Sequence, residues 1–400
     1  MNNELMKKIA RWVYPAKEQS HSIFTPVTDI SRLPGMEGDR AQRIAEVVRN
    51  FSFKANDYYL GLADWSDPDD PIRAIAEPRQ EEMDHWGAYD ASDEASNIQV
   101  HGLQHKYSDS VLFLITDNCA GYCRYCFRKR IFLEDADDVP TDYSQAYAYI
   151  AEHPEITDVI LSGGDPLTLS ARRIAGVLDQ LARIPHVQVV RIGSKTPAYN
   201  PTRLGGDPDL QEVFRKFSST SGKGLYLMAH FDHPRELTPL ALKELRLYRD
   251  CGMVLLNQAP ILRGVNDNPD TLRELFQILC RNGCAPYYMF QGRPVKGNRR
   301  FCIPITEAFQ IFQQAIGGVS GISKRVRFVM SHSTGKIEIV GLDRQYIYTR
   351  YRRAKSAMNQ ERFMVFHRDD QAYWLEDLEP VEPPRKSIIH RMKKLVSRSF

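Results

Sequence analysis

The sequence predicts an α/β protein built on a partial (β/α)6 barrel of the TIM type, with a helical N-terminal appendage and a small α+β C-terminal region. Residues 111–291 alternate short β-branched runs with longer amphipathic stretches, which is the pattern of βα units in a parallel sheet. Several polar motifs of this region directly follow predicted strands. The first hundred residues are instead charged and rich in helix formers and turns.

The elements expected along the chain divide it into three segments. Helices are expected at 171–183 and 240–250, and a further helix near 306–315. The six central strands are expected at 111–116, 158–162, 187–193, 225–231, 254–261 and 286–291, with later strands at 326–330, 336–340 and 346–351. We therefore expect a helical appendage over 1–105, the partial barrel over 106–300, and a C-terminal region over 301–400.

Composition favours small-molecule chemistry over nucleic-acid binding. The 53 basic and 50 acidic residues give a net charge of only +3, which is too balanced for nucleic acid as the main partner. The first residues lack the apolar core of a signal peptide, and no run of eighteen apolar residues occurs. We therefore expect a cytoplasmic protein without a transmembrane segment.

The last sixteen residues, 385–400, are basic and carry apolar residues at partly helical spacing. A docked or frayed terminal helix is the favoured interpretation. A role at a membrane surface or with an anionic partner is the alternative.

Three cysteines, Cys119, Cys123 and Cys126, follow the first predicted strand within eight residues. An all-cysteine [4Fe-4S] cluster uses four thiolates, so three would leave one iron open to a substrate or cofactor. A closed zinc site usually takes four ligands as two cysteine pairs, and no second pair follows at the usual separation. The motif therefore predicts a [4Fe-4S] cluster with a chemical role.

Two further motifs close predicted strands, at 162–166 and at 230–234. In βα barrels the reactive groups lie on loops at the carboxyl ends of the strands. The cysteine loop occupies the same kind of position. We therefore expect all three motifs to meet at one rim.

With these motifs the chain resembles the radical S-adenosylmethionine (SAM) enzymes, and within them the lysine 2,3-aminomutase family. The resemblance covers 107–291 and extends less closely to about 336. The matching segments are 114–117, 119–130, 162–167, 191–193, 230–234, 257–258, 262–267 and 286–288. The resemblance implies that the open iron binds SAM, which one electron cleaves to methionine and a 5′-deoxyadenosyl radical.

The resemblance also implies which residues contact SAM. Glycines permit close backbone approach, and a carboxylate accepts hydrogen bonds from an ammonium. An ordinary βα turn is the alternative for the Gly-Gly-Asp motif, as is a structural role for the histidine. The residues implied are Gly163, Gly164 and Asp165 for the methionine amino group, Tyr125 for the adenine, and His230 and Gln258 for the adenosyl group.

Members of the family that move an amine also carry pyridoxal phosphate (PLP), and the resemblance places its lysine at Lys336. A small polar turn with one glycine precedes this lysine; an exposed lysine that opens a strand is the alternative. Lys106 and Ser110 stand where the family has two phosphate-binding arginines, and Lys195 is a further cation that could compensate.

The resemblance implies transfer of an amino group from Cα to Cβ of an amino acid through the 5′-deoxyadenosyl radical. Arg128 matches the arginine that binds the substrate α-carboxylate. Arg293 and Ser331 stand where the lysine enzyme holds the distal ammonium, and a cation there disfavours free lysine. With four positive charges in 293–300, an anionic substrate such as glutamate is favoured.

Two other functions remain open: a radical SAM enzyme without PLP that performs another hydrogen abstraction, and a non-catalytic iron-sulfur protein of electron transfer. The aminomutase and the radical SAM enzyme without PLP would each need an electron donor such as flavodoxin or ferredoxin. The zinc-binding cysteines of the lysine enzyme are absent, with Asn268 at one of them. A homo-oligomer is therefore not predicted through that metal, although it stays possible by other contacts.

Overall fold

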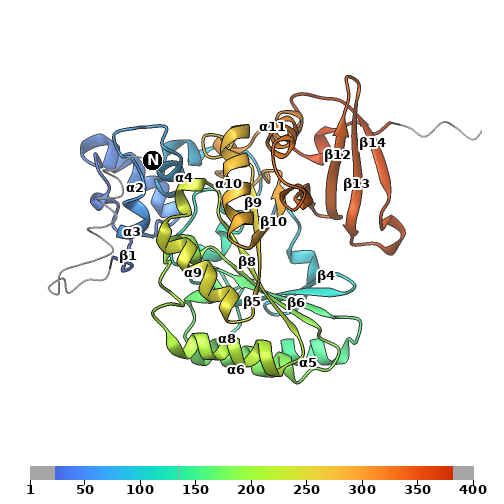
Figure 1. Cartoon of the computed structure of the whole chain (residues 1–400). Helices are drawn as coiled ribbons and strands as arrows, with labels where there is room; N and C mark the ends of the chain where they lie inside the picture. Colours follow the sequence, from blue (N-terminus) through green and yellow to red (C-terminus); the bar gives the residue numbers. More distant parts are fainter. Residues whose placement is uncertain (1–22, 134, 382–400) are drawn as a thin grey trace, which may run out of the picture.

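The computed structural model describes residues 23–133 and 135–381. Their dominant feature is one sheet of twelve strands in the order β14-β13-β12-β11-β10-β9-β8-β7-β6-β5-β4-β3. In Figure 1 the N-terminal residues lie at the left of the sheet and its last strands at the right. The basic segment 385–400 lies outside the described residues.

The six strands predicted for the central region are all present, and each pairs in parallel with the next. They are β5 (Ser110–Thr116), β6 (Asp158–Gly163), β7 (Val189–Ser194), β8 (Gly224–Ala229), β9 (Val254–Pro260) and β10 (Cys284–Phe290). In β6 and β7 buried and partly exposed residues alternate along the strand, so one face packs into the core while the other faces the inside of the fold.

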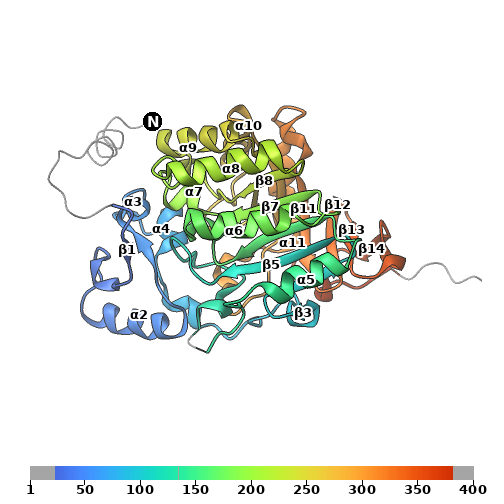
Figure 2. The ribbon, with the colours of Figure 1, turned by 90° about the horizontal axis from the view of Figure 1, so that it is seen from below.

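Helices follow these strands, and Figure 2 shows α6 and α8 side by side in front of the sheet. Further along the chain, α10 contacts α11. The helices are α5 (Ser144–Glu152), α6 (Ala171–Ala182), α7 (Thr196–Tyr199), α8 (Pro208–Thr220), α9 (Pro239–Asp250), α10 (Pro269–Arg281) and α11 (Ile305–Gly317). No helix among the described residues is long and apolar enough to cross a membrane.

Capping residues mark the first turns of four of these helices. The side chains of Ser170, Asp207, Thr238 and Asn268 cap α6, α8, α9 and α10 by accepting hydrogen bonds from backbone N–H groups of the first turn. The last three caps are each followed by proline at the first helical position, where its missing N–H costs nothing.

The sheet does not end at the sixth parallel strand. Helix α11 leads into β11 (Arg327–His332), which pairs in parallel with β10. The strands β12 (Gly335–Leu342), β13 (Tyr346–Ala354) and β14 (Phe363–His367) then add antiparallel neighbours. The parallel run therefore has seven strands, and β11 to β14 extend the main sheet. Local patterns predict a strand, but they do not predict its pairing partner.

The N-terminal region is only partly helical. It contains α2 (Gly38–Asn50), α3 (Asp57–Leu60), α4 (Pro71–Ala76) and a two-stranded sheet of β1 (Pro26–Val27) and β2 (Ala55–Asn56). The strands β3 (Ile98–Val100) and β4 (Leu103–Tyr107) then extend the main sheet beside β5 as antiparallel neighbours. Chain segments from both ends of the sequence thus reach the central strands.

Candidate active site

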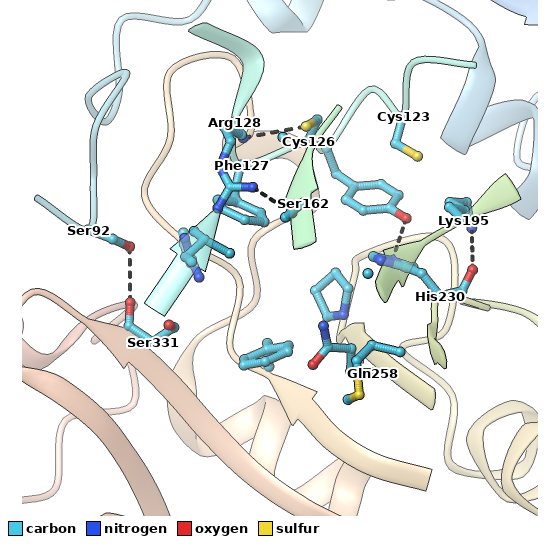
Figure 3. Close-up of a pocket in the computed structure, with 18 of the residues that line it drawn as sticks. Ser92, Cys123, Cys126, Phe127, Arg128, Ser162, Lys195, His230, Gln258 and Ser331 are labelled. Atoms are coloured by element: carbon cyan, nitrogen blue, oxygen red, sulfur yellow. Dashed lines mark hydrogen bonds between the residues drawn. The ribbon is translucent and has the colours of Figure 1, made fainter. Parts of the chain in front are cut away.

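A cavity of roughly 340 Å³ lies at the carboxyl ends of the parallel strands. Its lining comes from the cysteine loop, from β4 to β12, and from the segments before β3 and after β10 (Figure 3). The structure brings every residue predicted for the site to this one cavity: Lys106, Ser110, Cys119, Cys123, Tyr125, Cys126, Arg128, Gly163, Gly164, Asp165, His230, Gln258, Arg293, Ser331 and Lys336.

The cysteine loop follows β5 and is fixed by the N-terminal region. The N–H of Tyr122 donates to the carbonyl oxygen of Lys54 over 2.7 Å, and the N–H of Arg124 to that of Ile75 over 2.9 Å. The Arg124 guanidinium is buried and pairs with Glu82 at 2.8 Å. These contacts hold the loop against the cavity before any cofactor binds.

The three predicted cysteine ligands are free, partly buried thiols. Within residues 23–133 and 135–381, no three His, Cys, Asp or Glu side chains converge closely enough to hold one metal ion. Thiolates that each bind a different iron of a cluster need not converge on one point, so this geometry bears on a mononuclear site only. The donor set of three thiols in one cavity fits a [4Fe-4S] cluster. Cys302 also lines the cavity, with its Sγ 3.5 Å from the Arg293 carbonyl oxygen.

The Gly-Gly-Asp turn packs against the start of the cysteine loop. Gly163 has a φ of +114°, and a Cβ there would lie 2.1 Å from the carbonyl oxygen of Thr116. The N–H of Gly164 donates to the same oxygen over 2.6 Å. The backbone of the turn therefore approaches the segment before Cys119 so closely that only glycine fits.

The Asp165 carboxylate uses both oxygens within the protein. It accepts hydrogen bonds from the N–H groups of Leu167, Lys195 and Thr196 and from the Ser194 hydroxyl over 2.7 to 3.0 Å. Burial raises the pKa of this carboxyl, although the same hydrogen bonds oppose the rise. Asp165 thus ties the loop after β6 to the loop after β7, and its role toward the SAM amino group stays a prediction.

A buried network surrounds His230. Its Nε2 lies 2.9 Å from the Tyr125 hydroxyl and 3.0 Å from an oxygen of Asp232. The Lys195 ammonium lies between Asp232, at 2.7 Å, and Glu236, at 2.5 Å. Burial alone would lower the pKa of Lys195, but the two carboxylates raise it above its usual value. Lys195 is therefore held in this network by two carboxylates, and its part in binding a phosphate stays a prediction.

Lys336 is the second residue of β12 and lines the same cavity. Its Nζ lies 4.3 Å from the centre of the Tyr288 ring and 5.3 Å from that of Phe290. Burial, followed by the positive charges of Arg191, Arg293 and nearby lysine, lowers its pKa to about 7. A large fraction of this amine is therefore uncharged, and so nucleophilic, near neutral pH.

The cations near Lys336 are incompletely neutralised. Lys106 donates to the His332 carbonyl oxygen, and burial together with Arg293 lowers its pKa to about 8. Burial also lowers the pKa of Arg293 to about 10. In the described part of the chain, no carboxylate lies within 4 Å of the charged nitrogens of Lys106, Arg293 or Lys336. This end of the cavity therefore favours an anion.

Two arginines lie against the same aromatic ring. The guanidinium of Arg293 lies 3.8 Å, and that of Arg128 4.6 Å, from the centre of the Phe127 ring. Arg128 pairs with Glu94 at 2.8 Å and donates to the Ser162 hydroxyl over 3.1 Å (Figure 3).

Sequence reasoning missed Glu94 and Ser92, which line the cavity beside Arg128 and Ser331. It named Arg191 only as part of a matching segment. Arg191 lines the cavity too, paired with Asp158 at 2.7 Å. Glu94 stands among other acidic residues of the N-terminal region, so no local signal distinguishes it.

Comparison with known proteins supplies the family. No family model matches the chain. A protein of Aquifex aeolicus, provisionally named an L-lysine 2,3-aminomutase, is 46% identical over 88% of this chain and 94% of its own length. The L-lysine 2,3-aminomutase of Clostridium subterminale is 35% identical over 74% of this chain and 70% of its own. The glutamate 2,3-aminomutase of Clostridioides difficile is 31% identical over 77% and 72%. The chain therefore belongs to the lysine 2,3-aminomutase family of radical SAM enzymes, which are isomerases, and this family implies a [4Fe-4S] cluster and SAM.

Proposed function

We propose that this protein is a SAM- and PLP-dependent 2,3-aminomutase that moves an amino group from Cα to Cβ of an acidic amino acid, with glutamate favoured over free lysine. The observation that supports it most is the Lys336 amine, which has no ion-pair partner among the described residues. It shares one cavity with the three cysteine thiols.

Cys119, Cys123 and Cys126 would hold three irons of a cluster and leave the fourth for SAM. When bound, the cluster and SAM supply a 5′-deoxyadenosyl radical that abstracts a hydrogen atom. Such a radical needs an enclosed site beside its target. The backbone contacts with Lys54 and Ile75 anchor the cysteine loop, which forms part of the lining of this cavity.

Lys336 would hold PLP, which when bound supplies an aldehyde that carries the substrate amine. Its low pKa leaves the Nζ lone pair available, and the Tyr288 ring forms a flat apolar surface next to it. A phosphate dianion would neutralise the cations that lack a carboxylate partner, Lys106 foremost, with the Ser110 hydroxyl and Arg191 in the same cavity lining.

Arg128 and Arg293 would bind the two ends of the amino acid. Arg128 offers a planar fork suited to the α-carboxylate. Arg293, without a carboxylate partner, repels a distal ammonium and attracts a distal carboxylate. This charge pattern is the reason to favour an acidic amino acid.

The test is trapping of PLP on Lys336. Anaerobically reconstituted protein is incubated with PLP and reduced with borohydride, and its peptides are mapped by mass spectrometry. We expect a pyridoxyl group on Lys336 that is absent from Lys336→Ala, and β-amino products from a mixture of amino acids.

Two outcomes would contradict the proposal. Release of 5′-deoxyadenosine from SAM without any pyridoxyl-lysine would indicate a radical SAM enzyme that performs another hydrogen abstraction. A fully ligated cluster that does not respond to SAM would indicate an electron-transfer protein.

A further inference from the structure

We propose that Glu94 is a positioning residue, which fixes the direction in which Arg128 presents its guanidinium to the substrate α-carboxylate. The proposal deepens the proposed function and rests on it, since it requires an amino acid in this cavity. Neither the cysteine motif nor the spacing of charged residues predicts Glu94 as part of the site.

The Arg128 guanidinium is held on one edge by a bidentate ion pair. Its Nη2 lies 2.8 Å from Oε1 of Glu94, and its Nε donates to Oε2 over 3.1 Å. Its Nη1 donates to the Ser162 hydroxyl over 3.1 Å. Three of the five N–H groups of the guanidinium thus point at protein acceptors. One N–H remains on each Nη atom and can donate to a second acceptor, such as a substrate carboxylate.

The face of the guanidinium is restrained as well as its edge. The Phe127 ring centre lies 4.6 Å from the Arg128 guanidinium carbon, and the Arg128 side chain is only 7% exposed. A planar group held on one edge, on one face and at one further nitrogen has little freedom to rotate.

Glu94 is itself fixed in place. Its side chain is 10% exposed and also pairs with Arg130 at 2.9 Å. Its backbone N–H donates to an Asp90 oxygen over 2.8 Å. Two residues earlier, the Ser92 hydroxyl donates to the Ser331 carbonyl oxygen over 3.0 Å, across the cavity lining (Figure 3). Hydrogen bonds of the segment before β3 therefore fix the backbone that places the Glu94 carboxylate in the site.

The ion pair also gives the two arginines that lie on Phe127 different roles in substrate binding. Glu94 neutralises Arg128 without covering its remaining N–H groups, so Arg128 would select a carboxylate by direction. Arg293 has no carboxylate partner among the described residues, so it would select by charge. Without Glu94, Arg128 would be free to turn toward the distal carboxylate or the cofactor phosphate.

The experiment separates carboxylate recognition from general packing. Holoenzyme without reductant is incubated with a mixture of the ordinary L-amino acids, and the amino acid retained most strongly is identified by mass spectrometry. Its dissociation constant is then compared with that of the amine left when its α-carboxylate is removed. We expect Glu94→Ala to weaken binding of the amino acid about tenfold or more and to leave binding of the amine unchanged.

Glu94→Gln keeps the shape and one acceptor, so its loss should be intermediate. If Glu94→Ala fails to fold, Glu94→Gln carries the same comparison. Glu77→Gln is the matched control, because Glu77 is buried, pairs with Arg73 at 2.8 Å, and does not line the cavity. Glu77→Gln should not change the ratio of the two dissociation constants.

The failures are distinguishable. If the wild type retains no amino acid, the proposed function fails and the role of Glu94 fails with it. If the wild type retains an amino acid but the Glu94 variants weaken the amino acid and the amine equally, or neither, the positioning role alone is overturned.

Discussion

The Nζ atom of Lys336 lies 4.3 Å from the centre of the Tyr288 ring, and no carboxylate of the described residues pairs with it. Most buried lysines are stabilised by an acidic partner, as Lys195 is by Asp232 and Glu236. Lys336 instead faces other cations, which together with burial disfavour its charged form. The same cavity thus contains one lysine kept charged and one lysine whose pKa lies near neutral pH.

The reactivity of Lys336 should follow its lowered pKa. Because the pKa is near 7, the neutral amine becomes dominant above that pH, whereas an ordinary lysine requires a pH near about 10.4. Reductive methylation of the apoprotein at a series of pH values, read by peptide mass spectrometry, should show half-maximal labelling of Lys336 near pH 7. Labelling that rises only above about pH 9, as for an ordinary lysine, would contradict this.

The same shift should affect stability. The unfolded chain binds a proton at this lysine between about pH 7 and 10.4 that the folded chain does not, so the free energy of unfolding should rise with pH in this window. Lys336→Met should reduce that rise in chemical denaturation of the apoprotein. An identical pH dependence in both proteins would place the lowered pKa elsewhere.

Cys123→Ala should abolish cleavage of SAM, because the cluster would lose one of its three predicted ligands. The measurement is 5′-deoxyadenosine formed after anaerobic reconstitution and reduction. Cys280→Ala is the control, since Cys280 is a free thiol outside the cavity lining. An unchanged yield of 5′-deoxyadenosine in Cys123→Ala would defeat the ligand assignment.

Gly163→Ala should destabilise the protein and lower its iron content. The added Cβ would lie 2.1 Å from the Thr116 carbonyl oxygen at a φ of +114°, and strain of this kind costs on the order of 2 kcal/mol or more. Gly176→Ala is the control, since nothing lies within 4 Å of a Cβ there in α6. It should be neutral or slightly stabilising. Thermal unfolding measures the stability of both variants, and iron analysis measures their iron content. If Gly163→Ala and Gly176→Ala have the same stability and iron content, the predicted strain at Gly163 is refuted.

Arg293→Asp should shift the preference from acidic toward basic amino acids, because it replaces a cation of the cavity with an anion. Competition between glutamate and lysine, measured by the β-amino products formed, would report the shift. Arg299→Asp makes the same charge change at a side chain that is 61% exposed and should leave the preference unaltered. If Arg293→Asp also leaves it unaltered, Arg293 does not contact the substrate.

Much of the site could be predicted because its signals are local. Predicted strands end within three residues of Cys119, Gly163 and His230, and parallel strands bring their carboxyl ends together. The spacing of the three cysteines needs no knowledge of the fold. For the same reason the six central strands and the helices α6, α9 and α11 could be located from periodicity.

The rest depends on contacts between distant residues. Glu94 and Arg128 are 34 residues apart. The sequence around either residue does not indicate that the two form an ion pair. Nothing in the sequence around Lys195 indicates an ion-pair partner. The fold places Asp232, from the loop after β8, beside it. The pairing of β11 with β10 is likewise set by packing of α11 and not by the strand's own pattern.

All of the proposed chemistry depends on a predicted iron that has no protein thiolate. The most direct test is the electron paramagnetic resonance spectrum of the reduced, anaerobically reconstituted protein, recorded before and after addition of SAM. Binding of SAM to an open iron should change the spectrum of the reduced cluster. A spectrum that SAM leaves unchanged, or the absence of any cluster signal, would contradict it.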